Sequence, residues 1–178
     1  MDYALDGPVP WADESLAGAG TIHLGGTLEE IAAAENAVAR GEHPDRPYVL
    51  AVQPCVADPT RAPAGKHTFW AYIHVPNGST VDRTDAIENQ LERVAPGFRD
   101  RVLARSVMTP ADLQRWNPNL VGGDVGGGAQ DLVQFLRRPV LPPRPWETPL
   151  PGVSLCSSSI APGGGVHGMG GWQAAARA

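Results

Sequence analysis

The residues best suited to chemistry form a glycine-rich run near the carboxyl end of the chain. Gly163–Gly168 reads Gly-Gly-Gly-Val-His-Gly, which matches the pattern G-x-G-x-x-G. The run lies between a predicted strand over 153–156 and a predicted helix over 169–178. Glycines in such a turn let backbone N–H groups approach a phosphate or an electron-rich ring at a helix N-terminus. A close-packed turn without a ligand has the same pattern, so the residues alone leave both interpretations open.

The same run does not predict a self-contained dinucleotide-binding unit. A Rossmann unit needs a second strand after the helix and an acidic residue for the ribose. Only ten residues follow Gly168 in this sequence. We therefore expect any cofactor role of this turn to depend on further polypeptide.

Cys156 and the residues before it suggest a nucleophile as an alternative. Gly152–Cys156 reads Gly-Val-Ser-Leu-Cys, but a nucleophile elbow needs a small residue where Cys156 stands. With a histidine nearby in space, Cys156 would be a thiol nucleophile, and the protein a Cys156-dependent hydrolase. A cysteine at the end of an apolar strand is more often buried and inert, and we expect that of Cys156.

No metal site is predicted. His67 and His74 are separated by an odd number of positions, so on one strand they face opposite sides and cannot share an ion. Cys55 and Cys156 are distant in sequence, and the chain has no C-x-x-C motif.

Composition narrows the class of protein. The net charge is −5 and no long basic run exists, which argues against nucleic-acid binding. No apolar stretch is long enough for a transmembrane helix, and the acidic start does not resemble a signal peptide, so we expect a cytoplasmic protein. The 178 residues include 21 glycines and 18 prolines, which predicts many turns and short elements.

The elements that must position these residues alternate without a strict βαβ order, which predicts an α+β fold with a mixed sheet. A capping box at Thr27 starts one predicted helix, and Thr109 before Pro110 starts another. Residues 67–75 form the strongest predicted strand. Because both of its faces are partly apolar, we expect it to be covered on both sides. The side chains of Trp70, Tyr72 and Trp172 are suited to border a flat ligand, but core packing is the simpler interpretation, and we expect all three in the core. The other predicted strands are 2–5, 21–24, 48–53 and 153–156, and the other predicted helices are 84–95 and 169–178.

Several segments together resemble phytoene dehydrogenase-like FAD-dependent oxidoreductases, a family that includes the pyridine nucleotide-disulfide oxidoreductase domain-containing proteins. The resemblance is carried by residues 148–159 (TPLPGVSLCSSS) and 162–171 (PGGGVHGMGG), and it extends upstream through 2–11 (DYALDGPVPW), 23–27 (HLGGT), 62–68 (APAGKHT) and 117–119 (NPN). It therefore covers essentially the whole chain.

The resemblance implies a partial substrate-binding domain over 1–147 and an FAD-binding segment over 148–178, which would dock on an N-terminal FAD domain that this chain lacks. The cofactor contacts it implies are Ser157, Ser158, Gly164, Gly165, Val166, His167 and Gly168. It implies hydride transfer from a small-molecule substrate to FAD, and the desaturase analogy implies that this substrate is apolar. No catalytic acid or base is identified.

A different class of function is also left open, namely a catalytically inactive truncated remnant or an interaction module. Val166, Met169 and Trp172 lie near the start of the last predicted helix and would form an exposed apolar patch if nothing covers them. Such a patch predicts self-association of the isolated chain.

Overall fold

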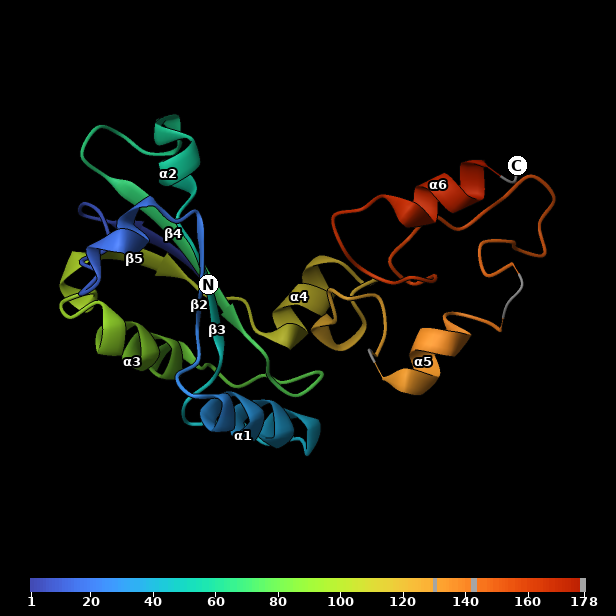
Figure 1. Ribbon diagram of the computed structural model, residues 1–178, viewed down its shortest axis with the longest axis horizontal. Coiled ribbons are helices and arrows are strands. Elements are labelled where there is room, and N and C mark those ends of the chain that lie inside the picture. The colour runs from blue at the N-terminus through green and yellow to red at the C-terminus, as the bar shows by residue number, and fades with distance from the viewer. Residues whose placement is uncertain (130, 142–143, 177–178) are drawn as a thin grey trace.

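The computed structural model describes residues 1–129, 131–141 and 144–176. Figure 1 shows a sheet with helices at one end of the molecule. At the other end it shows a carboxyl-terminal part of short helices and long irregular segments. The helix α4 (Pro110–Trp116) lies between these two parts.

The sheet has five strands in the order β2-β3-β4-β1-β5, and every pairing is antiparallel. The strands are β1 (Asp2–Leu5), β2 (Thr21–Leu24), β3 (Val49–Val52), β4 (His67–Ile73) and β5 (Val102–Ser106). The predicted α+β class is confirmed, and the sheet is antiparallel rather than mixed. The apolar pattern locates strands but contains no information about their relative direction.

The helices begin where side chains can cap them. Thr27 accepts a hydrogen bond from the N–H of Glu30, and Glu30 accepts one from the N–H of Thr27, at the start of α1 (Leu28–Ala39). Thr109 and Asp112 form the same reciprocal pair before α4. Both predicted helix starts are confirmed. They could be predicted because a capping side chain and its backbone partner are close in sequence.

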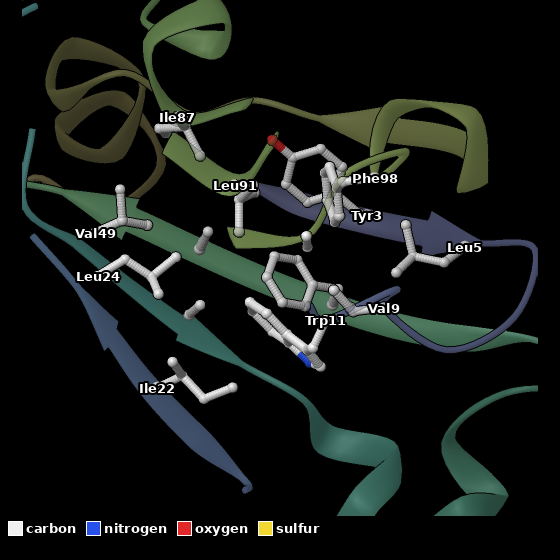
Figure 2. Close-up of a cluster of buried hydrophobic side chains, with 14 residues drawn as sticks. Tyr3, Leu5, Val9, Trp11, Ile22, Leu24, Val49, Ile87, Leu91 and Phe98 are labelled. Carbon is white, nitrogen blue, oxygen red and sulfur yellow. The ribbon is translucent and has the colours of Figure 1, made fainter. Parts of the chain in front are cut away.

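The predicted helix over 84–95 is also confirmed, as α3 (Thr84–Val94), and it covers one face of the sheet. Its buried Ile87 and Leu91 join the main core, which Figure 2 shows. A salt bridge of 3.6 Å between Arg93 and Glu30 links α3 to α1. The short helix α2 (Pro54–Ala57), which the sequence did not predict, precedes β4.

Three aromatic rings lie at the centre of the main core. The ring centroids of Tyr3 and Phe98 are 5.3 Å apart in an edge-on arrangement. The centroid of the Phe69 ring lies 5.8 Å from that of Tyr3 and 5.3 Å from that of Phe98. Trp11 closes one side, and its indole N–H donates to Gln53 Oε1 at 3.0 Å. The buried indole N–H of Trp11 is thus paired within the core.

The opposite face of the sheet is open. On β4, Phe69 and Ala71 are buried, whereas Trp70 is 37% exposed and Tyr72 is 36% exposed. The prediction that this strand is covered on both faces is therefore wrong. Successive side chains of a strand point to opposite faces, and α3 covers only one of them.

The carboxyl-terminal part has its own small core of Trp146, Ile160 and Ala174. The predicted strand over 153–156 is not present. Ser154 makes an isolated bridge with Glu147, and the N–H of Leu155 donates to Trp146 O at 2.7 Å. The helices here are α5 (Leu132–Arg137) and α6 (Met169–Ala175), and the last two residues of the helix predicted over 169–178 lie outside the described residues.

We expect the core to lose stability at high pH through Tyr3. Burial, together with the nearby Glu88 carboxylate, raises the pKa of Tyr3 well above its usual range. Above a pKa of about 10 the unfolded chain releases the phenol proton while the folded chain retains it, so the free energy of unfolding falls by up to about 1.4 kcal/mol per pH unit. Urea unfolding between about pH 9 and about pH 11 measures this slope.

The matched variants are Tyr3→Phe and Tyr72→Phe. Tyr3→Phe should flatten the pH dependence, and Tyr72→Phe, which changes an exposed tyrosine, should leave it steep. Equal slopes in the two variants would contradict the assignment to Tyr3.

Candidate cofactor site

The segment Ser157–Gly168 forms an irregular turn that leads into α6. Ile160 is fully buried, and Gly163 donates its N–H to Ile160 O at 2.8 Å. Gly168 has a left-handed conformation (φ 62°) and is the N-cap of α6. The prediction that this run opens a helix is confirmed, although no strand precedes it.

His167 is oriented by the start of α6. The N–H of Met169 donates to His167 Nδ1 at 3.0 Å, so a neutral ring carries its proton on Nε2. A Cβ atom at Gly165 would lie 2.7 Å from His167 Cδ2, and Gly165 has a φ of +152°. The fold itself therefore requires glycine at position 165. Val166, between these two residues, is fully exposed.

A second glycine-rich segment, Gly126–Gly128, lies against this turn. A Cβ atom at Gly127 would be 2.6 Å from Ser158 Oγ, and one at Gly164 would be 4.0 Å from Gly126 O. The sequence shows the five glycines of 122–128 plainly, but we expected only a loop there. The contact with Ser158 is long-range, and no local pattern indicates it.

Asp124 and Arg138, which carry opposite charges, bind the N–H groups and the carbonyl groups of the Gly126–Gly128 loop. The Asp124 carboxylate accepts the N–H groups of Gly126 at 2.7 Å and Gly128 at 2.6 Å. Arg138 Nη2 donates to Gly126 O at 3.1 Å and to Gly128 O at 2.7 Å. Arg138 was not among the residues that the sequence singled out, because a single arginine after a short apolar run carries no signal.

The structure divides the predicted site residues into two groups. Ser158 and Gly164 lie beside the Gly126–Gly128 loop. The remainder lie on the exposed surface beside it, namely Ser157, Gly165, Val166, His167 and Gly168. The Ser157 hydroxyl donates to Ser159 Oγ at 3.1 Å. Together they form a surface made mostly of backbone, flanked by an apolar side chain and an imidazole.

The open face of the sheet is a second candidate surface. Val52 pairs with Trp70 and Leu50 pairs with Tyr72, so these four side chains share one face. The rings of Trp70 and Tyr72 have centroids 5.2 Å apart. This face offers apolar and aromatic contacts with few charges.

Cys156 is exposed, which contradicts the expectation of a buried thiol. That expectation depended on a strand that does not form. Within the described ranges the Cys156 thiol makes no hydrogen bond to a histidine or to any other group. The geometry that a Cys156-dependent hydrolase needs is therefore not present there.

Neither a candidate membrane span nor a candidate metal cluster lies within the described residues. No helix among them has both the length and the apolar character needed to cross a membrane. No group of three or more histidine, cysteine, aspartate or glutamate side chains in those ranges is arranged to hold a metal ion.

Comparison with known proteins finds relatives that are named as an oxidoreductase domain-containing protein and as a dehydrogenase. The chain is 36% identical over 142 residues to the pyridine nucleotide-disulfide oxidoreductase domain-containing protein 2 of Rattus norvegicus, and 35% identical to that of Mus musculus, with 73% of this chain covered in each case. It is 32% identical over 133 residues, 70% of its length, to 4,4'-diapolycopen-4-al dehydrogenase of Metabacillus indicus. No protein-family model matches the chain.

The aligned part spans about a quarter of each relative, 24% of both mammalian proteins and 26% of the bacterial one. The chain is thus related to an oxidoreductase family over most of its own length. The sequence resemblance to such oxidoreductases is supported to that extent.

We expect Gly165→Ala to destabilise the turn and Gly164→Ala to leave it unchanged. Alanine at 165 would occupy a strained φ and displace the His167 ring, at a cost of roughly 1 kcal/mol or more. At 164 a Cβ atom meets only ordinary contacts of 3.8 and 4.0 Å. Amide hydrogen exchange over 157–176 measures the difference, and equally fast exchange in both variants would contradict it.

Proposed function

We propose that this chain supplies the flavin-facing turn and the substrate-facing sheet of an FAD-dependent oxidoreductase. In this proposal Ser157, Ser158 and Gly164–Gly168 contact the cofactor, and further polypeptide with a dinucleotide-binding fold holds most of its phosphates. FAD, when bound, accepts a hydride from a C–H or C–N bond of a small-molecule substrate. The residues of this chain bind and orient the two partners.

The observation that carries the proposal is that the free chain does not require glycine at position 164. Its φ is not in the left-handed region, and a Cβ atom there would meet nothing closer than 3.8 Å. Neither backbone conformation nor packing in the free protein therefore requires glycine at this position. Close approach of a ligand to the backbone is a physical reason for glycine here.

The side chains around Gly164 suit a flat, partly polar ligand. Val166 is fully exposed and Trp172 is 64% exposed, so both offer apolar contact area beside the turn. His167 Nε2 carries the proton of the neutral ring and is available to donate a hydrogen bond to a ring nitrogen or oxygen. These features fit a flavin better than a purely apolar molecule.

The open sheet face supports an apolar substrate. Trp70 and Tyr72 present their rings to solvent beside Leu50 and Val52. An exposed apolar surface of this kind is a common mark of a binding site. One relative is named 4,4'-diapolycopen-4-al dehydrogenase, and a dehydrogenase agrees with the proposed type of reaction.

A non-enzymatic interaction module is the second candidate. Leu132 is 86% exposed, Val133 56% and Leu136 66%, all on the short helix α5. Three exposed apolar side chains on one helix favour a contact with another protein surface or a second copy of the chain. This function requires no flavin, so flavin binding distinguishes the two.

The flavin proposal predicts local protection from amide exchange. At millimolar FAD, exchange should slow over Ser157–Gly168 and over 124–128, and FAD affinity should be weak because most phosphate contacts lie elsewhere. Gly164→Ala should reduce that affinity by about tenfold, because a methyl group worth roughly 1.4 kcal/mol of lost contact blocks the backbone. Gly171→Ala, where an added Cβ meets nothing within 4 Å, is the matched control.

Two results would count against the flavin site. One is protection that appears only over the sheet, and the other is equal FAD affinity in Gly164→Ala and Gly171→Ala. Sedimentation of the flavin-free chain tests the second candidate, because an interaction module with an exposed α5 should self-associate.

A further inference from the structure

Arg138 is a buried cation without a counter-ion. The residue is only 6% exposed, and no acidic side chain within the described ranges forms a salt bridge with it. An arginine side chain does not lose its proton in proteins, so the charge persists. Burying an uncompensated charge is unfavourable, and buried charges are normally paired.

Only some of the N–H donors of the Arg138 guanidinium have a hydrogen-bond acceptor in the described part of the protein. Nη2 donates to Gly126 O and Gly128 O, which uses both of its hydrogens. Nε is buried and has no acceptor. Nη1 has no acceptor among the described residues either, but it is not fully buried. A ligand can therefore reach the guanidinium at Nη1.

The acids close to Arg138 in sequence are committed elsewhere. Both oxygens of Asp124 accept backbone N–H groups of the glycine loop. Asp131 caps α5 by accepting the N–H of Gln134 at 2.7 Å. The loop thus presents its carbonyls to Arg138, while its carboxylate is engaged by backbone N–H groups and forms no salt bridge with the guanidinium.

Small residues keep the remaining side of Arg138 clear. A Cβ atom at Gly163 would lie 3.0 Å from Nη1, so any side chain there would compete for this space. Ser158 borders the same loop, and its hydroxyl makes no hydrogen bond within the described part of the chain. Two free donors, Nη1 and the Ser158 hydroxyl, therefore flank the Gly126–Gly128 loop.

We propose that Arg138 and Ser158 form a binding site for an oxyanion of the phosphate class. A guanidinium with free N–H groups, a free hydroxyl and glycine backbone are the groups that proteins use to bind phosphate. An anion with several oxygens can accept from Nη1 and the hydroxyl together, which a carboxylate does less well. The proposal does not require a flavin, because a phosphorylated substrate and a flavin diphosphate share this chemistry.

The test uses the full chain and inorganic pyrophosphate as the probe. Equilibrium dialysis should show saturable binding of one equivalent. Arg138→Gln should weaken it by at least tenfold, Arg138→Lys should weaken it less, and Arg137→Gln, which changes the exposed neighbouring arginine, should leave it within twofold. Acetate at the same concentration should not compete.

A measurement on the unaltered protein keeps the test valid if a variant misfolds. The Nε–H resonance of Arg138 in an ¹⁵N spectrum should shift on addition of pyrophosphate. FAD and riboflavin then identify the source of the anion, because only FAD should compete with pyrophosphate if the site takes the flavin diphosphate. No competition by FAD would indicate another phosphate compound.

Three outcomes would overturn the proposal. They are the absence of saturable pyrophosphate binding, an equal loss of binding in Arg137→Gln and Arg138→Gln, and an Arg138 resonance that pyrophosphate leaves unchanged. Equal competition by acetate would overturn the assignment to phosphate.

Discussion

The sheet depends on its first strand. β1 lies between β4 and β5 and is the only strand that joins the β2-β3-β4 half of the described sheet to β5. Met1 and Ala71 exchange backbone hydrogen bonds of 2.8 and 2.9 Å beyond the end of the ladder. From this position the Tyr3 ring contacts the rings of both Phe69 and Phe98, and Figure 2 shows Tyr3 beside Phe98. Residues 1–5 are therefore fixed between two neighbouring strands and against the centre of the core.

Because the core lies on one face of the sheet, the other face of the sheet stays uncovered. The core lies between the sheet and α3, so buried side chains of β1 and β4 point toward Ile87 and Leu91. The alternate residues of β4 must then point the other way, and these are Trp70 and Tyr72. The open aromatic face is thus a direct consequence of where the helix packs, and its exposure does not depend on a flexible loop.

Local interactions were predictable from the sequence, and long-range ones were not. Both helix starts could be predicted, as a capping box at Thr27 and as an N-cap at Thr109, because capping partners are close in sequence. Edge strand β5 was missed, since four of its five side chains are exposed and its pattern is weakly apolar. Strand direction, the open face of β4 and the exposure of Cys156 are set by neighbours distant in sequence. The resemblance located the glycine-rich turn, but only the folded structure shows that Arg138 and the Gly126–Gly128 loop lie beside it.

The candidate site combines two kinds of glycine with different physical causes. Gly165 is required by the fold, because its φ and the His167 ring leave no room for a side chain. Gly164 has no such requirement, because a Cβ atom there would meet nothing closer than 3.8 Å. The loop beside it is organised by charge: Asp124 accepts its N–H groups and Arg138 donates to its carbonyls. These hydrogen bonds hold Gly126–Gly128 in place without side-chain packing. They leave exposed glycine backbone close to the Arg138 guanidinium, which has no counter-ion among the described residues. A ligand with both a planar ring and an anionic group would satisfy both features at once, which neither a purely apolar ligand nor a protein surface without acidic groups would do.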